Sequence, residues 1–173
     1  MSAFATEELM GERTRGLITA TSHPFLAKEL DAATREIQNY CGWHIAPEES
    51  KTITRLSRFP EEIWIPAMQI TAVTAVQAEG IEWSDLTGVE FDPQTGWTNI
   101  RARRIHLTYT AGFEEVPEDL VALTLQMAAR ALGVSLGILR EQTLSASLTF
   151  TASADDRSRF ESVLMPYKIG YLP

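Results

Sequence analysis

The clearest hydrophobic periodicity in the chain lies between residues 22 and 42. Apolar side chains recur there at intervals of three and four residues, which places them on one face of a helix. Pro24 suits a first turn, since proline has no N–H to leave unpaired, and Gly42 suits the end, where a left-handed residue is common. The pattern predicts a long helix whose buried face consists of Leu26, Leu30, Ala33, Ile37 and Tyr40.

Residues 51–109 change character, because β-branched and aromatic side chains now occur in short runs between turn residues. Near the end of this region Ile105 and Leu107 alternate with Arg104 and His106, which is the period of a strand with one buried face. The region therefore predicts a small β insertion, with strands near 51–57, 63–69, 71–78, 88–91 and 100–109.

A second helical pattern begins at Pro117. Glu118 and Asp119 would lie in its first turn, where carboxylates complement the partial positive charge of a helix start. The following residues up to 132 are nearly all apolar, which is more than a single buried stripe requires. We expect a helix over 117–132, ended by Gly133, that is buried on several sides, one of them against a neighbouring subunit.

The two ends of the chain are less regular. Residues 1–21 mix charged residues, Thr and Gly without a period, so we expect a flexible N-terminal arm. Residues 142–152 alternate apolar side chains with Ser and Thr, which favours a strand. Residues 153–173 predict a C-terminal helix and an apolar tail, which either close the core of their own subunit or dock on a partner.

Composition limits the classes of function. The chain has 173 residues, 45% of them hydrophobic, and a formal net charge of −8, so non-specific binding of nucleic acid is disfavoured. Its longest apolar runs are too short to span a membrane. The single cysteine, Cys41, excludes an internal disulfide.

Candidate chemistry is sparse. Cys41 and His44 have the spacing of a zinc-ligand pair, but a structural zinc site needs about four ligands and no second pair is present. No motif for a serine nucleophile occurs, and the paired carboxylates fall at expected turns, where solvated charge is usual. We therefore predict no catalytic residues, no metal and no cofactor. An enzyme that uses His44 or His106 with a carboxylate, or a ligand-binding β module, remains a remote alternative.

One basic cluster stands out in this acidic chain. Arg101, Arg103 and Arg104 lie within four residues of one expected strand. They could meet phosphate or the carboxylates of a partner protein, or simply form a solvated face.

Two segments carry a family resemblance. The first runs Tyr-Cys-Gly-Trp-His over residues 40–44, and the second runs Tyr-Thr-Ala-Gly-Phe over 109–113 and Val-Pro-Glu-Asp-Leu over 116–120. Together with the helix–insertion–helix order over about residues 22–168, this chain resembles the head-to-tail adaptor (connector) proteins of long-tailed bacteriophages, especially those that infect actinobacteria.

The resemblance implies a structural virion protein of α+β class: a small helical bundle of two long helices and a C-terminal helix, with the β-sheet inserted between the first two. The adaptor domain would span 22–152, and 153–173 would dock a partner. Such proteins form a ring, commonly of twelve subunits, under the portal and extend the DNA channel in the virion neck, after assembly in the host cytoplasm. A stopper or tail-completion protein is the alternative within the neck.

Two contact sets follow from this interpretation. The portal-binding set would be anchored by the aromatic and apolar side chains of the C-terminal segment, because aromatic residues dominate interface energetics. It consists of Phe160, Leu164, Tyr167, Lys168 and Tyr171. The set for a subunit or neck contact consists of Trp83, Trp97, Arg101 and Arg103. Genomic DNA would pass without specific binding.

Overall fold

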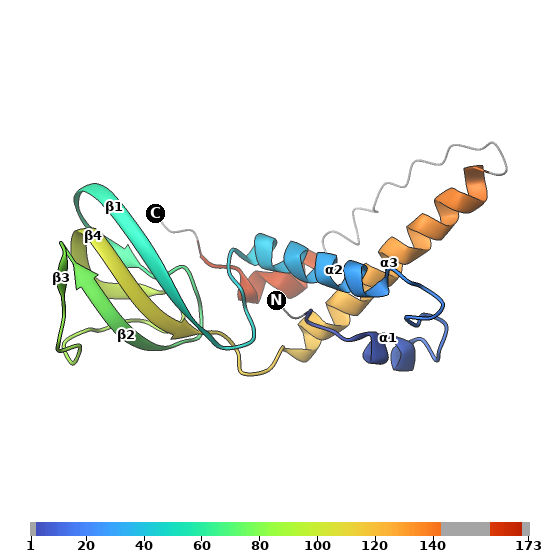
Figure 1. Cartoon of the computed structure of the whole chain (residues 1–173), viewed down its shortest axis with the longest axis horizontal. Coiled ribbons are helices and arrows are strands. Elements are labelled where there is room, and N and C mark those ends of the chain that lie inside the picture. The colour runs from blue at the N-terminus through green and yellow to red at the C-terminus, as the bar shows by residue number, and fades with distance from the viewer. Residues whose placement is uncertain (1–2, 143–159, 171–173) are drawn as a thin grey trace. The chain divides into compact units, whose positions relative to one another are not determined.

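A computed structural model of the chain describes residues 3–142 and 160–170, with side chains omitted for 134–142. The predicted α+β class is confirmed, since helices flank an inserted antiparallel sheet (Figure 1). The chain divides into two compact units. The helical unit combines residues up to 40 with 117–166, and the β unit combines 41–116 with the residues from 167. We expected one domain over 22–152, but the insertion has a core of its own.

The helical unit is built from α1 (Glu7–Arg13), α2 (Leu26–Cys41, whose last residue belongs to the β unit) and α3 (Glu118–Gln142). The stripe predicted for α2 is confirmed, because its first four members are at most 5% exposed. These helices share one hydrophobic cluster, which contains Ala5, Met10, Leu26, Leu30, Leu125, Ala128 and Leu132. Residues 160–164 add a helical turn, followed by the 3₁₀ turn η1 (Met165–Tyr167).

The expected flexible arm is wrong for most of residues 3–21, because α1 forms there. Thr6 caps it: the Leu9 N–H donates to the Thr6 Oγ1 at 3.3 Å, which satisfies one of the unpaired donors of a helix start. Met10 is only 1% exposed. Upstream of the helix, the Phe4 N–H donates to Thr34 Oγ1 at 2.9 Å. This arm is therefore part of the core of the helical unit.

Helix α3 differs from the prediction in length and in surroundings. It continues through Gly133, since a glycine within a helix costs only about 1 kcal/mol relative to alanine. Its apolar residues are mostly buried or half-buried within the chain itself, so the surplus apolar surface expected on this helix is small in the described part. The most exposed large apolar side chains lie elsewhere: Leu17, Leu56, Phe59, Ile81, Phe25 and Met165.

The β unit holds a four-stranded antiparallel sheet of order β1-β4-β2-β3 (Figure 1). The strands are β1 (Glu49–Trp64), β2 (Ile70–Ala78), β3 (Ile81–Glu82) and β4 (Trp97–Ala111). Alternation in β4 is confirmed, because Ile105, Leu107 and Tyr109 are at most 2% exposed. Strand β4 is central and β1 forms an edge.

Two predicted strands are corrected. The run 63–69 is not a separate strand, because β1 continues to Trp64 through an irregularity at 57–60 and the chain then turns. The run 88–91 forms only an isolated bridge between Phe91 and Thr98. The predicted strand at 142–152 lies outside the described residues, apart from residue 142, which ends α3. No helix among the described residues is long and apolar enough to cross a bilayer.

Candidate functional site

Cys41 is buried at the end of α2. Burial raises the pKa of its thiol to about 11, against a smaller opposing effect of the Lys168 charge. The thiol is therefore protonated at neutral pH, whereas a nucleophile or metal ligand must be a thiolate. Among the described residues, no group of three or more His, Cys, Asp and Glu side chains is placed to hold a metal ion.

His44 is likewise a buried structural group, with 7% of its surface exposed. Its Nε2 lies 2.9 Å from the Ala111 carbonyl oxygen, and since a carbonyl only accepts, Nε2 carries the hydrogen and donates. The Glu49 carboxylate is 3.8 Å from the same atom and 2.8 Å from Lys51 Nζ. Burial, and then the Lys51 charge, lower the pKa of His44, while Ala111 and Glu49 oppose them.

This arrangement predicts a pH dependence of stability. The folded pKa of His44 lies below its ordinary value of 6.5, so the unfolded chain takes up a proton first as pH falls. The stabilising contribution is therefore present above pH 6.5 and is lost below it, with a slope of at most about 1.4 kcal/mol per pH unit. Urea unfolding between pH 7.5 and 5 measures this, above the range in which the carboxylates titrate.

A matched control separates this histidine from the others. The His106→Gln variant, which changes an exposed histidine on β4, should keep the same decline in unfolding free energy between pH 6.5 and 5. His44→Gln should flatten it. An equal slope in the His44 variant and the wild type would contradict the assignment.

An aromatic cluster lies beside His44 in the β unit. The ring centroid of Phe113 is 6.3 Å from that of Trp43 and 5.8 Å from that of Tyr167. The Trp43 Nε1–H donates to the Tyr167 carbonyl oxygen at 2.6 Å, and the Ile169 N–H donates to Cys41 O at 3.1 Å. Residues 167–169 are thus held against the start and the end of the insertion, within the chain's own fold.

The structure distributes the predicted portal-binding residues between buried and exposed positions. Leu164 is only 6% exposed, within the helical unit. Phe160 is half-buried, with the Arg130 guanidinium 5.9 Å from its ring centroid. Tyr167 is half-buried in the aromatic cluster, and Lys168 is exposed. Tyr171 lies outside the described residues.

The second predicted set is only partly assembled. Arg101 and Arg103 are both exposed on β4. Trp97 begins the same strand opposite Trp64, while Trp83 follows β3 and its N–H donates to Val76 O at 2.9 Å on β2. The register therefore groups the arginines but does not place the two tryptophans in one cluster with them.

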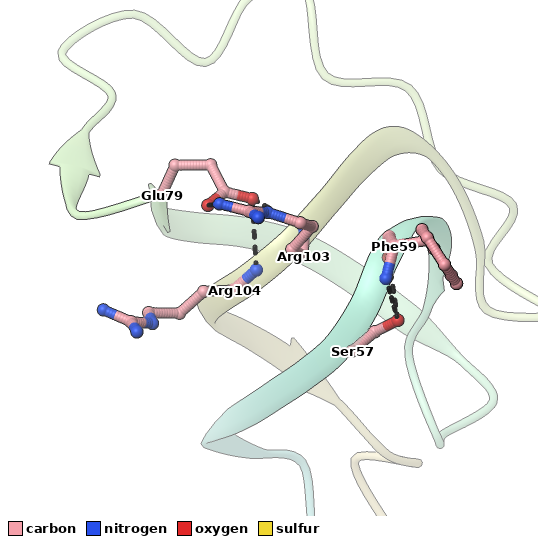
Figure 2. A network of polar contacts seen from close by, with 5 residues as sticks. All are labelled: Ser57, Phe59, Glu79, Arg103 and Arg104. Carbon is pink, nitrogen blue, oxygen red and sulfur yellow. Dashed lines mark hydrogen bonds and ion pairs between the residues drawn. The ribbon is translucent and has the colours of Figure 1, made fainter.

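The arginines lie where the sheet bends. Pairing of β1 with β4 is regular to Leu56, opposite Arg104, and resumes at Glu61, opposite Ala102. Residues 57–60 bulge out between these points, and Ser57 binds the Phe59 backbone through its hydroxyl, which accepts from N–H at 3.2 Å and donates to C=O at 2.7 Å. Figure 2 shows this bulge beside the arginines of β4.

Glu79, at the end of β2, fixes the bend from the other side. Its Oε1 accepts the backbone N–H groups of Arg103 at 2.7 Å and Arg104 at 3.3 Å, and its Oε2 lies 3.6 Å from the Arg103 guanidinium (Figure 2). These bonds hold the pKa of Glu79 below its ordinary value. Two consecutive arginine side chains are thus both exposed, because a bulge interrupts the alternation of buried and exposed positions along β4.

Exposed apolar side chains accompany these arginines. Leu56, opposite Arg104 in the register, is 75% exposed, and Phe59 in the bulge is 65% exposed. We call the set the bend patch; it consists of Leu56, Arg58, Phe59, Arg103 and Arg104. Sequence reasoning found the arginines of β4 but missed the apolar members. The signal was Pro60 after an aromatic residue within a strand pattern, since proline in a strand marks a bulge or an edge.

Solved structures with a similar fold complete the description. The chain matches a structure of the neck of the empty GTA particle, computed with C6 symmetry, with a TM-score of 0.61 and 16% identity over 96% of this chain and 90% of that one. It matches the neck of the native GTA particle, computed with C12 symmetry, with a TM-score of 0.57 and 17% identity over 95% and 91%.

A third structure, the virion of a native gene transfer agent (GTA) particle, gives a TM-score of 0.55 and 17% identity over 86% of this chain and 78% of that one. The chain shares their fold. All three are structures of GTA particles or of their necks. No protein-family model matches the sequence, and no curated protein does.

Proposed function

We propose that the chain is a structural neck protein of a phage-like particle, a head-to-tail adaptor that forms a ring between the portal and the next neck protein and extends the DNA channel. The observation that carries the proposal is the likeness of fold over 96% of the chain to a component of a particle neck. The helix–insertion–helix order expected from the sequence motifs agrees with it.

The charge of the chain suits this role. A net charge of −8 per copy would make the wall of a channel repel the phosphates of passing DNA. The repulsion acts within about 8 Å at physiological salt, so it prevents adhesion without binding the duplex. DNA would then slide past a ring of such subunits without sequence-specific contacts.

The portal contact is proposed for the C-terminal segment, with the roles of its residues refined by the structure. Leu164 and Tyr167 hold the segment in the chain's own fold, because the first is buried and the second lies against Phe113. Met165 is 62% exposed and Lys168 is exposed as well, so we assign the portal contact to these two side chains. Methionine is among the residue types enriched at protein interfaces, and we expect the Lys168 charge to lie at the polar rim of the contact.

Co-expression with the portal of the same particle tests this function. The wild-type chain should co-purify as a ring on the portal, with a native mass that gives its copy number. Met165→Asp with Lys168→Glu should weaken the complex about tenfold or more, since charge is then buried or mismatched at the contact. The control, Leu17→Asp with Lys28→Glu, makes the same kind of change at exposed positions of the helical unit and should bind like wild type.

Other outcomes have defined meanings. Unchanged portal binding by the Met165/Lys168 variant would reject the C-terminal contact. Association of the wild type with a lower neck ring but never with the portal would instead assign the chain as a stopper or tail-completion protein. Failure to join any ring of the particle would reject the proposed function.

A further inference from the structure

We infer that the bend patch docks on the acidic segment at residues 114–119 of a second copy of this chain, and that this contact closes the ring. The inference rests on the proposed function, which requires a ring but does not say which surfaces form it.

The bend patch has the composition of a protein interface. It combines two large apolar side chains, Leu56 at 75% and Phe59 at 65% exposure, with exposed arginines. The Arg58 guanidinium lies 5.5 Å from the ring centroid of Phe59, so this arginine is stacked and partly ordered before any partner arrives. Aromatic residues and arginine are the residue types enriched where proteins bind one another.

The arginines point to an acidic partner. Within the described residues, Arg103 is paired with Glu79, but Arg58, Arg101 and Arg104 have no carboxylate within 4.0 Å. These arginine side chains can therefore pair with the carboxylates of another molecule. Phosphate is the weaker match, because a DNA backbone offers nothing to Leu56 and Phe59 and is repelled by the net charge.

The segment 114–119 is the complementary surface. Glu114, Glu115, Glu118 and Asp119 are exposed, and the apolar residues between them are half-buried. In the part of the chain that the structure describes, Glu114, Glu115 and Glu118 make no hydrogen bond or ion pair. Several other carboxylates already have partners: Asp85 binds Thr87, Asp92 binds Gln94 and Glu49 binds Lys51. Among the residues that the structure describes, Glu114, Glu115 and Glu118 are therefore the densest group of carboxylates without a hydrogen bond or ion pair.

The two surfaces differ, and this difference determines the symmetry of the assembly. A contact between two unlike patches is heterologous: each copy uses its bend patch on one neighbour and its acidic segment on the other. Such contacts generate a closed ring when the rotation per copy closes, whereas a self-complementary patch gives only a dimer. A contact between the bend patch and the acidic segment is thus the kind that a ring needs.

Disulfide trapping in the full-length chain tests the contact. Phe59→Cys and Glu115→Cys are made separately and together, and native Cys41 is retained because its thiol is buried, with a pKa raised to about 11. A mixture of the two single variants should form a cross-linked heterodimer. The double variant should form a ladder of covalent oligomers that ends at the ring size. In the control mixture, Phe25→Cys replaces Phe59→Cys, at a phenylalanine that is 62% exposed. This mixture should form at least about tenfold less cross-linked heterodimer.

A charge exchange provides an independent arm. Arg58→Glu with Arg104→Glu should weaken ring formation about tenfold or more, and Glu115→Arg with Glu118→Arg on the same chain should restore it. Lys28→Glu with Arg35→Glu changes the net charge equally on exposed positions of α2 and should leave the ring mass unchanged. Native mass spectrometry of concentrated protein measures each variant.

The outcomes separate this inference from the proposed function. Heterologous links and charge rescue support it. Links only between two copies of the Phe59 variant would show a self-complementary dimer and overturn it. Rings of wild-type mass without the Phe59–Glu115 link would overturn the inference and leave the adaptor function standing. Binding of a DNA duplex that is lost in the Arg58/Arg104 variant would assign the patch to nucleic acid and overturn it also.

Discussion

The Gly96→Ala variant is expected to lose about 4 kcal/mol of unfolding free energy in the β unit. Gly96 has a φ of +76°, where a side chain is strained, and an added Cβ would overlap the Ile65 carbonyl oxygen and lie 3.3 Å from Ala67 O. The glycine cannot move aside, because its C=O accepts from Ile65 N–H at 2.8 Å and its N–H donates to Asp92 O at 3.0 Å. Urea unfolding followed by tryptophan fluorescence measures the loss.

Gly80 is the matched control for this prediction. Its φ of +85° is similar, but no atom lies within 4 Å of an added Cβ. Gly80→Ala should therefore cost only the backbone strain, about 1 kcal/mol. Equal losses in the two variants would show that the contact with Ile65 is relieved by small shifts, and the steric argument would be wrong.

Gly112→Ala is expected to destabilise the same unit by about 3 kcal/mol. At a φ of +124°, its added Cβ would lie 2.8 Å from His44 Nε2 and 2.9 Å from Pro47 O. The Ala111 carbonyl that His44 binds is the preceding residue, so the strain also reaches this buried hydrogen bond. Thermal unfolding gives the change in midpoint, and hydrogen exchange locates it.

A second substitution divides this effect between its causes. In the Gly112→Ala/His44→Ala double variant the imidazole contact is absent, but the clash with the Pro47 backbone remains. We expect the alanine at 112 to cost less in the His44→Ala background than in wild type, without becoming neutral. A cost unaffected by His44→Ala would mean that the backbone contact alone decides the effect.

The helices were predictable because their signals are local. The stripe from Leu26 to Ile37 recurs at helical spacing and is buried as expected. Helix α3 was found for the same reason, but its end was placed too early, because packing along a helix outweighs the small cost of one internal glycine. The N-terminal arm was misjudged, since the burial of Phe4 and Met10 depends on contacts far along the chain.

The strands were predictable in composition but not in connection. The alternation of β4 is visible in the sequence, whereas the break expected between strands near 51–57 and 63–69 is a bulge within one long strand that ends at Trp64. Bulges depend on the partner strand, here on the Glu79 carboxylate that binds two consecutive N–H groups of β4. No pattern in the sequence near residue 103 announces that contact.

The same reason limited the candidate site. Arg101 and Arg103 were singled out by sequence proximity, but the position of Arg103 beside Leu56 and Phe59 arises from the pairing of β1 with β4, which periodicity alone does not give. The C-terminal residues had two readings, and the structure places Leu164 and Tyr167 within the chain's own fold. The portal contact itself stays a prediction, now directed to Met165 and Lys168.

Strand β1 also affects how separate copies of the chain interact through the open edge of the sheet. An open sheet edge invites pairing with strands of other molecules, and natural proteins discourage this with charges, proline and distortion. The edge formed by β1 has all three: Lys51 and Arg55 along its regular part, Pro60 within the bulge, and two glutamates after it. Addition of strands from other copies to this edge is therefore disfavoured, which lowers the tendency of concentrated protein to form fibrils.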